Sequence, residues 1–296
     1  MSANDAAIDF EAEYNNRIRV PAWQTLTTRT AELSAAYRAE CAARGTSELA
    51  VAYGSDPRHR YDVFRAEAER PLGAGPLCVF IHGGYWQRGD RADASFVARH
   101  LNAAGVDVVL PSYRLCPAVR VADIVEDLRG CLASLWARTG RRPVVVGHSA
   151  GGHLAAAMLA TDWPARGADL PADLVRAAMP ISGAFDPTAL LSTSLNEALR
   201  LTADEATALN IAQWKAPAGA DLVAVVGGGE SGEFLRQTLD LVAIWSAAGI
   251  AAEAVVVPNA NHFTVLQPFE QASSAMLRRI LQLARAATIG AGPAST

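Results

Sequence analysis

Paired cysteines, basic clusters and long apolar runs are all scarce in this sequence of 296 residues. The four cysteines, Cys41, Cys78, Cys116 and Cys131, are widely spaced and include no Cys-x-x-Cys pair. Thiols scattered in this way through apolar segments argue against a disulfide framework and favour a reducing compartment.

Charge and targeting signals are also weak. No apolar run approaches the roughly 18 residues that a membrane-spanning helix needs. The formal net charge is −4, and no dense Lys/Arg cluster is present that would follow a nucleic-acid backbone. Residues 1–13 are polar and acidic and lack the basic and apolar blocks of a signal peptide. We therefore expect a cytoplasmic protein without a nucleic-acid or membrane partner; whether it forms a homodimer stays open.

Apolar residues, by contrast, make up 51% of the chain, enough for one large buried sheet. A helix at 23–44 and an antiparallel hairpin at 48–53 and 61–67 come first. Strands are then expected at 77–81, 106–110, 143–147, 175–181, 221–226 and 251–257, and helices at 92–104, 119–138, 150–160, 234–248 and 270–287. Strands that alternate with helices predict a single α/β domain over 1–296, with a mostly parallel central sheet and helices on both faces.

Residues 186–214 interrupt this alternation, since they hold short helical pieces and no strand. An insert at the end where the strands finish is expected to cover a site as a small helical cap. The tail at 289–296 is rich in Gly, Ala, Pro, Ser and Thr, which predicts disorder.

A Gly-His-Ser-Ala-Gly pentapeptide with Ser149 at its centre directly follows the strand expected at 143–147. Gly147 and Gly151 suit the sharp strand-to-helix turn that lifts a nucleophilic hydroxyl above a sheet. The next helix begins there, and its dipole favours a developing negative charge. Small residues could instead serve only close packing, but the position of the pentapeptide at the strand–helix junction favours Ser149 as a nucleophile.

A second motif, His-Gly-Gly-Tyr-Trp at 82–86, follows the strand at 77–81. Acyl transfer places negative charge on the carbonyl oxygen, which fixed backbone N–H groups stabilise. We expect the amides of Gly84, Tyr85 and Ala150 to form this oxyanion hole. A tight turn without function is the alternative.

The chain order serine, acid, histidine identifies His262, which follows the last strand, as the general base. The preceding loop at 227–233 offers two carboxylates. Glu230 is preferred, because Glu233 begins a helix, where an acidic residue is often only a dipole partner. Asp186 is a third candidate on an earlier loop.

Together these motifs resemble the kynurenine formamidase (arylformamidase) branch of the α/β-hydrolases, which lies near the hormone-sensitive-lipase-like esterases. The similar stretches are spread over most of the chain, at 14–17, 82–87, 147–154, 181–183, 193–201, 233–237 and 261–263. The resemblance implies the α/β-hydrolase fold and a triad of Ser149, Glu230 and His262. Glu230 stands where the family commonly has aspartate. Residues 113–117 (Tyr-Arg-Leu-Cys-Pro) are more similar to the esterases.

The expected function is hydrolysis of an aryl amide or formamide, such as N-formylkynurenine, through an acyl-enzyme and without a metal or organic cofactor. A carboxylesterase of small acyl or aryl esters is one alternative, and a non-catalytic binding protein on the same fold is another. The aromatic residues Tyr85, Trp86 and Phe185 are expected to form an apolar pocket, with His82 and Gly83 as further substrate-binding residues. Ordinary core positions are the alternative for these aromatic residues.

Overall fold

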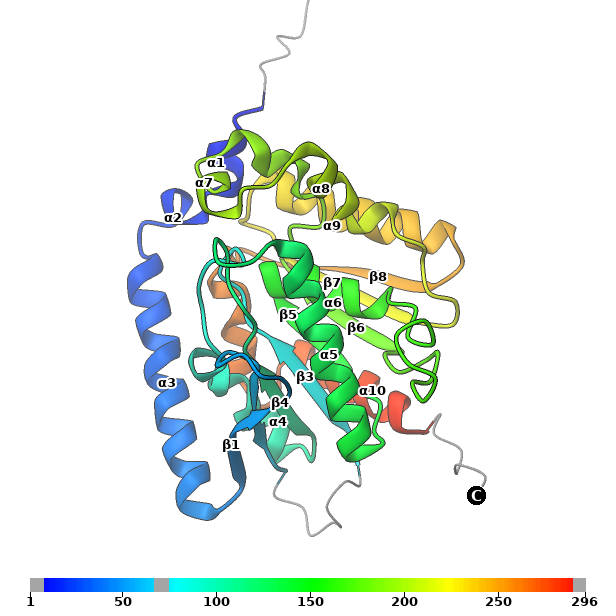
Figure 1. The fold of residues 1–296 in the computed structure, drawn as a ribbon. Coiled ribbons are helices and arrows are strands. Elements are labelled where there is room, and N and C mark those ends of the chain that lie inside the picture. The colour runs from blue at the N-terminus through cyan, green and yellow to red at the C-terminus, as the bar shows by residue number, and fades with distance from the viewer. Residues whose placement is uncertain (1–7, 67–74, 290–296) are drawn as a thin grey trace, which may run out of the picture.

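A computed structural model describes residues 8–66 and 75–289, whose centre is an eight-stranded sheet in the order β1-β2-β4-β3-β5-β6-β7-β8 (Figure 1). The strands are β1 (Ser47–Ala52), β2 (Arg60–Phe64), β3 (Leu77–Ile81), β4 (Asp107–Pro111), β5 (Val144–His148), β6 (Ala177–Ile181), β7 (Asp221–Gly227) and β8 (Ala251–Val257). Apart from Ile289, the tail expected to be disordered lies outside the described residues.

The sheet is mostly parallel, as the alternating pattern predicts. Strand β2 runs antiparallel to β1 and β4, and the other neighbouring pairs are parallel. Every residue of β3, β5 and β6 is buried. Helices cover both faces of these strands, which is why each reads as a continuous apolar run rather than an alternation.

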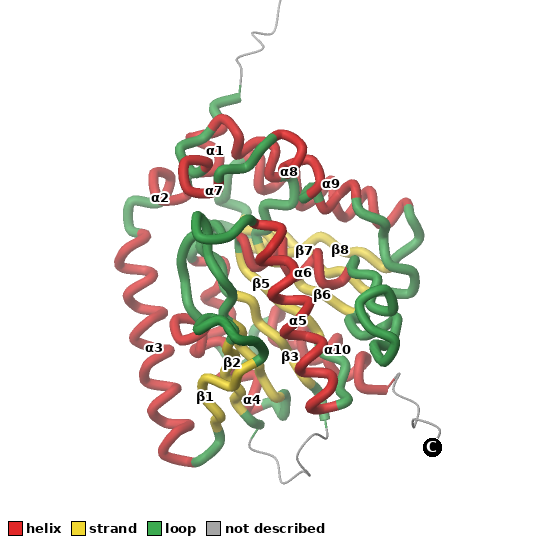
Figure 2. The backbone as a smooth tube through the Cα atoms, viewed as in Figure 1, coloured by secondary structure: helices red, strands yellow, loops and turns green. Residues whose placement is uncertain are grey.

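Helices pack on both faces of the sheet (Figures 1 and 2). They are α1 (Phe10–Tyr14), α2 (Asn16–Arg19), α3 (Trp23–Arg44), α4 (Ala98–Ala103), α5 (Val121–Thr139), α6 (Ala150–Leu159), α7 (Asn196–Leu199), α8 (Ala203–Ala208), α9 (Gly232–Ala247) and α10 (Ala275–Ile289). The core on one face includes side chains of α5, α6 and α9, and the core on the other includes those of α3, α4 and α10. No helix in the described ranges has both the length and the apolar character needed to cross a membrane.

Two helix boundaries differ from the expectation by more than two residues. The segment expected as one helix at 92–104 begins as the 3-10 helix η1 (Arg91–Val97), with α-helical geometry only from Ala98. The closing helix starts at Ala275, not at 270, after the 3-10 helix η4 (Thr264–Glu270). The hydroxyl of Ser274 accepts a hydrogen bond from the amide of Leu277 at 3.2 Å, which caps the helix start.

The insert at 186–214 has short helices and no strand, as expected. It contains η2 (Pro187–Ser192), α7, α8 and η3 (Ile211–Gln213) between β6 and β7. Two further short helices, α1 and α2, precede α3 at the same end of the molecule (Figure 1). The cover over this end of the sheet therefore comes from two parts of the chain that are far apart in sequence.

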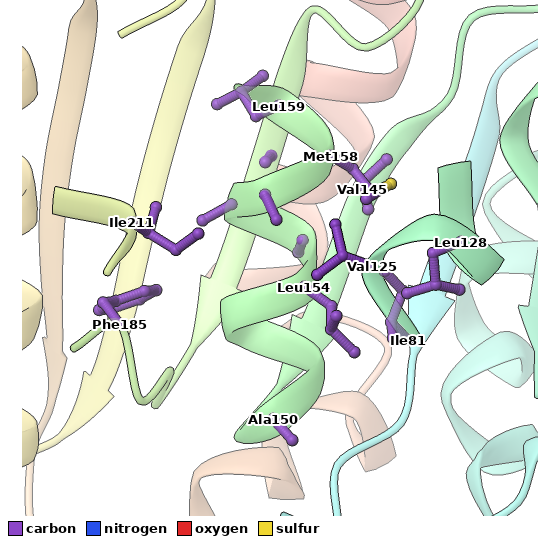
Figure 3. Close-up of a cluster of buried hydrophobic side chains, with 14 of the residues drawn as sticks. Ile81, Val125, Leu128, Val145, Ala150, Leu154, Met158, Leu159, Phe185 and Ile211 are labelled. Atoms are coloured by element: carbon purple, nitrogen blue, oxygen red, sulfur yellow. The ribbon is translucent and has the colours of Figure 1, made fainter. Parts of the chain in front are cut away.

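Helix α6 is buried along its whole length, where it packs on β5 and β6 with α5 beside it (Figure 3). Three consecutive alanines, 155–157, allow this close approach because their side chains need little room. Leu154 is fully buried beside Ile81 and Val125 in the same cluster. This packing holds the first turn of α6, and with it the preceding Ser149, against the sheet.

We expect Leu154→Ala to lower the free energy of unfolding by about 2–5 kcal/mol, because it leaves a cavity in this packed layer. Leu239→Ala is the matched control: Leu239 also lies on a helix but is 48% exposed, so its loss is expected to be below about 1 kcal/mol. Urea unfolding of both variants measures the two values. Equal losses would contradict the central place of α6 in the core.

Candidate active site

Ser149 occupies a strained turn between β5 and α6. Its backbone has φ 58° and ψ −121°, a conformation that L-residues other than glycine rarely adopt. The turn is held by two hydrogen bonds, from the Ser149 amide to the Ile181 carbonyl at 2.8 Å and from the Gly152 amide to the Ser149 carbonyl at 2.8 Å. Such strain persists only where the surrounding structure enforces it, and it is typical of nucleophile turns.

The two glycines of the pentapeptide are there because the turn is crowded. A Cβ atom on Gly147 would lie 2.0 Å from the Gly151 carbonyl oxygen. A Cβ atom on Gly151 would lie 2.1 Å from the carbonyl oxygen of Ile81 in β3. Both distances are far inside van der Waals contact, so any side chain would push β5, α6 and β3 apart.

His262 lies in the loop after β8 and is held by Glu230. Its Nδ1 atom is 2.7 Å from Oε2 of Glu230, which follows β7, and both side chains are buried. The other carboxylate oxygen, Oε1, accepts hydrogen bonds from the Ser182 hydroxyl at 2.5 Å and from the Gly227 amide at 2.7 Å. Glu230 thus fixes the orientation of the imidazole and is itself fixed by two further donors.

The surroundings keep Glu230 ionised. Burial alone would raise the pKa of this carboxyl group, but the opposite charge of His262 and the hydrogen bonds from His262, Ser182 and Gly227 outweigh it. The pKa of Glu230 therefore lies below its usual value. An ionised carboxylate beside a histidine favours the charged form of the imidazole.

The two alternative acids have other partners. Glu233 accepts hydrogen bonds from the Tyr14 hydroxyl at 3.0 Å and from the Arg236 guanidinium. Asp186 accepts hydrogen bonds from Thr188 and caps η2. Of the three candidate carboxylates, the structure brings only Glu230 into contact with His262.

The His-Gly-Gly-Tyr-Trp loop lies against the turn at Ser149. Gly84, Tyr85 and Trp86 have φ values of 117°, 50° and 54°, three successive left-handed residues. A Cβ atom on Gly84 would lie 2.3 Å from the Arg88 carbonyl oxygen, and one on Gly83 would lie 3.0 Å from the Ser149 Cβ atom. Ala150, the third predicted amide donor, begins α6 directly after Ser149.

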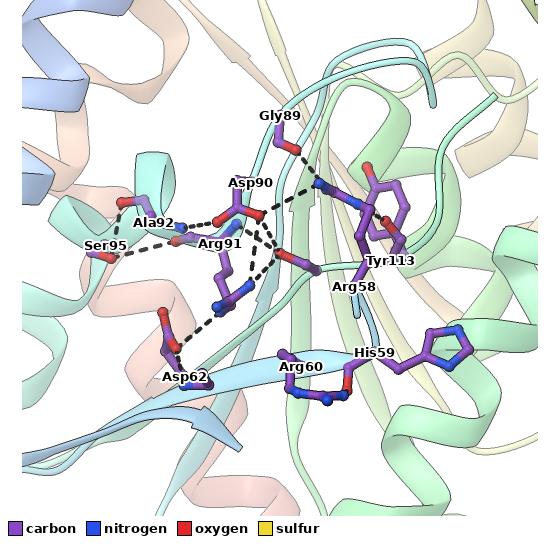
Figure 4. A network of polar contacts seen from close by, with 12 residues as sticks. Arg58, His59, Arg60, Asp62, Gly89, Asp90, Arg91, Ala92, Ser95 and Tyr113 are labelled. Carbon is purple, nitrogen blue, oxygen red and sulfur yellow. Dashed lines mark hydrogen bonds and ion pairs between the residues drawn. The ribbon is translucent and has the colours of Figure 1, made fainter. Parts of the chain in front are cut away.

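A polar network holds the far end of this loop (Figure 4). The Arg58 guanidinium donates to the Gly89 carbonyl at 2.7 Å and to the Tyr113 carbonyl at 2.6 Å. Ser112 donates to Asp90 at 2.9 Å. These bonds tie the loop to the segments beside β2 and β4 and hold its unusual backbone in place.

Ser149, His262 and the loop face one cavity of about 530 Å³. This volume lies in the range of small-molecule sites, about 300–1,000 Å³. His82, Gly83, Gly84 and Tyr85 also line the cavity. Leu195 is the one described residue of the insert that lines it, whereas the N-terminal segment contributes Asn15, Asn16, Arg17, Trp23, Leu26, Thr27, Thr28, Thr30 and Ala31.

Trp86 and Phe185, two of the aromatic residues predicted for the pocket, lie in the core instead. Both are almost fully buried and neither lines the cavity. Trp86 packs edge-on against His153 of α6 with ring centroids 5.2 Å apart. In sequence, an aromatic residue of the core and one of a pocket look alike; here the structure separates Tyr85 from the other two.

The segment around Tyr14 anchors the N-terminal helices to the site. The motifs in the sequence predict no site role for it. The Tyr85 hydroxyl donates to the Tyr14 carbonyl, and Asn16 donates to the Tyr85 hydroxyl at 3.3 Å. Gln237 of α9 donates to the Tyr14 hydroxyl. The resemblance of 14–17 and 233–237 to one family was the available signal for these contacts.

Three buried histidines surround the site in the neutral form. Burial is the main cause that lowers the pKa of His82 and His153 to about 4 and of His148 to about 3. The Nε2–H of His148 donates to the His262 carbonyl at 2.8 Å, and that of His153 donates to the Leu209 carbonyl at 2.8 Å. His148 thereby supports the loop of His262, and His153 joins α6 to the insert.

These pKa values predict loss of stability in mild acid. Between about pH 6.5 and pH 4, the unfolded chain protonates His153 while the folded chain does not. The free energy of unfolding should therefore decrease as the pH is lowered through this window. His153 alone should contribute about 1 kcal/mol per pH unit to this decrease. His153→Gln, whose amide can still donate to Leu209, should show a shallower fall by urea unfolding at several pH values. Parallel curves for the two proteins would contradict this.

Comparisons with known proteins agree with this geometry. Residues 78–266 match a family described as alpha/beta hydrolase fold. Kynurenine formamidase of Salmo salar is 31% identical over 236 residues, which are 76% of this chain and 78% of the relative. Esterase LipC of Mycobacterium tuberculosis is 36% identical over 131 residues, which are 41% of this chain and 32% of the relative.

A solved structure from Silicibacter, provisionally assigned as a thioesterase, superposes with a TM-score of 0.80 at 30% identity. It covers 93% of this chain and 99% of the other. The family match spans more than half of the sequence, and the salmon relative covers most of both chains. The chain therefore belongs to the α/β-hydrolase fold family, in the branch that resembles kynurenine formamidase.

Proposed function

We propose that this hydrolase uses Ser149 as its nucleophile and cleaves an aryl amide or formamide of the N-formylkynurenine type through an acyl-enzyme. One observation carries the proposal: Ser149, in its strained turn, faces the same cavity as His262, whose Nδ1 atom is bound to Glu230. A nucleophile, a base and an acid that orients the base are the parts that acyl transfer requires.

In the first step, the Ser149 hydroxyl oxygen attacks the carbonyl carbon while Nε2 of His262 takes the hydroxyl proton. Glu230 stabilises the resulting imidazolium through Nδ1–H. The amides of Gly84, Tyr85 and Ala150 donate to the carbonyl oxygen as it becomes negative. His262 then gives its proton to the leaving nitrogen as the C–N bond breaks. Water, activated in the same way, releases the acyl group and restores Ser149.

The composition of the cavity supports an aromatic substrate. Trp23, Leu26, Tyr85 and Phe263 contribute aromatic and aliphatic surface to its lining. Flat apolar walls with a few polar groups are typical of sites for small aromatic ligands. The name of the salmon relative points to the same substrate class.

A carboxylesterase is the second candidate. The esterase from Mycobacterium tuberculosis matches this chain over 131 residues. Ester and amide hydrolysis need the same serine, base and oxyanion donors and differ in the leaving group that the base must protonate. We also propose a cytoplasmic location, which the four buried free thiols support.

The serine mechanism predicts selective covalent labelling. An organophosphonate probe should label the wild-type protein at Ser149, and Ser149→Ala should stay unlabelled, because only an activated hydroxyl reacts readily.

Glu230→Gln should lower kcat by about 10²- to 10⁴-fold, since His262 loses its charged partner. Glu253→Gln, a carboxylate on β8 bound to Arg279 at 3.0 Å, is the control and should match wild type. Labelling of another residue in Ser149→Ala would exclude Ser149.

The substrate class is tested with matched formanilides and phenyl formates. We expect the wild-type protein to cleave both. Because an amidase protonates the poor amine leaving group, kcat/KM for the amide should lie within about 100-fold of that for the ester. Product formation is followed by mass spectrometry. Cleavage of the esters alone would favour the carboxylesterase.

A further inference from the structure

Two arginines face the cavity that contains Ser149. Arg17 is an exposed residue of α2, and Arg88 is a half-buried residue in the loop between β3 and η1. Both line the cavity of about 530 Å³ together with Ser149 and His262. Two cationic side chains therefore border the space in which a substrate would lie, and the mechanism above uses neither of them.

Neither guanidinium has an anionic partner within residues 8–66 and 75–289. No hydrogen bond or ion pair joins either guanidinium to a described side chain or carbonyl. Arg19, on the same short helix as Arg17, differs in this respect because it pairs with Glu13 at 3.5 Å. After burial, the positive charge of Arg88 is the next cause that holds the pKa of Arg17 below its usual value. The two cations thus repel each other, and an anion placed between them would relieve this.

Arg17 is also oriented for binding. Its guanidinium carbon lies over the indole of Trp23, 4.1 Å from the ring centroid. This contact holds the guanidinium in place, and no described side chain or carbonyl accepts a hydrogen bond from its N–H groups. These in-plane donors match the two oxygens of a carboxylate or phosphate.

The position of α2 relative to the loop is fixed by the contacts of Tyr85. Its hydroxyl donates to the Tyr14 carbonyl and accepts from Asn16, the residue before Arg17. On the loop side, Gln87, the residue before Arg88, donates to the Leu195 carbonyl at 2.9 Å. The segments that carry the two arginines are therefore held in place next to one another.

Two carboxylates also line the cavity, Asp90 and Asp93. Asp90 accepts hydrogen bonds from Ser112 and Ala92 and lies 3.6 Å from the guanidinium of Arg91, so its charge is already compensated. Burial, and then the charge of Asp90, raise the pKa of Asp93. Among the described residues that line the cavity, Asp93 is the one carboxylate without an ion pair, whereas two guanidinium groups, those of Arg17 and Arg88, lack one.

We propose that Arg17 and Arg88 together bind a negatively charged oxygen group of the substrate, a carboxylate or a phosphate, while the scissile carbonyl lies at Ser149. This inference rests on the proposed function and narrows it: the preferred substrates are anionic acyl compounds. Neutral aryl amides or esters bind without this contact.

The test compares charged and neutral partners of the same shape. The substrates are ortho-, meta- and para-formamidobenzoate with the corresponding formamidobenzamides, and acetoxybenzoates with acetoxybenzamides. In Arg17→Gln and Arg88→Gln, KM for a carboxylate substrate should rise by roughly tenfold to a hundredfold with kcat nearly unchanged. The neutral partner should change less than about twofold, and Arg17→Lys should recover part of the loss.

Arg19→Gln is the matched control, because Arg19 lies on the same helix but does not line the cavity. It should leave both substrates unaffected. High salt should weaken the carboxylate preference of the wild-type protein and leave the neutral substrate unchanged. If both arginine variants affect charged and neutral substrates equally, the arginines have a structural role only and the proposal is wrong.

A second pair of substrates separates the two sources of negative charge. Acetyl-coenzyme A carries phosphates, and S-acetyl-N-acetylcysteamine is its neutral counterpart. If the Arg17→Gln and Arg88→Gln substitutions raise KM only for acetyl-coenzyme A, the bound group is a phosphate. Dependence confined to the benzoates identifies a carboxylate, and dependence in neither pair overturns the proposal.

Binding to Ser149→Ala protein keeps this test independent of turnover. Calorimetric titration with the formamidobenzoates and acetyl-coenzyme A should give tighter binding than with their neutral counterparts, and Arg17→Gln should abolish the difference. If none of the substrates is cleaved while this preference holds, the proposed function fails and the anion site stands. If cleavage occurs while no charged compound is preferred, only the anion site fails.

Discussion

The close approach of β5, α6 and β3 around the turn at Ser149 is the constraint on which the rest of the site depends. The turn leaves no room for a Cβ atom at Gly147 or Gly151. It places Ser149 at the start of a helix that is buried along its whole length. The helix can lie this deep because its side chains are mostly small. The packing of the core and the geometry of the turn at Ser149 therefore depend on the same residues.

The pattern of apolar runs was sufficient to predict the parallel sheet, because fully buried strands have little choice of composition. The pentapeptide and the late histidine were recognisable because their chemistry demands fixed residue types at fixed places along the chain. The choice among Glu230, Glu233 and Asp186 depended on which carboxylate reaches His262. That is a matter of tertiary structure, and the distance of 2.7 Å between His262 Nδ1 and Glu230 Oε2 favours Glu230.

Other parts of the site had no local signal. Trp86 and Phe185 are aromatic residues near the motifs, yet they fill the core. Tyr14 and Glu233 meet across 219 positions in sequence. Such contacts follow from how helices dock, and no periodicity of a single segment encodes them. For the same reason, the contribution of α2 and α3 to the cavity could not be predicted from the hydrophobic pattern of either helix.

The short N-terminal helices have a practical consequence for handling this protein. They lie beside the cavity, and Ile8, the first described residue, precedes Arg17 by only a few positions. A shortened form of the protein that lacks α1 and α2 would therefore lose the part of the cavity wall that Asn15, Asn16 and Arg17 form. Shortened or fused forms should therefore keep the chain from residue 8 onward, so that this wall is retained.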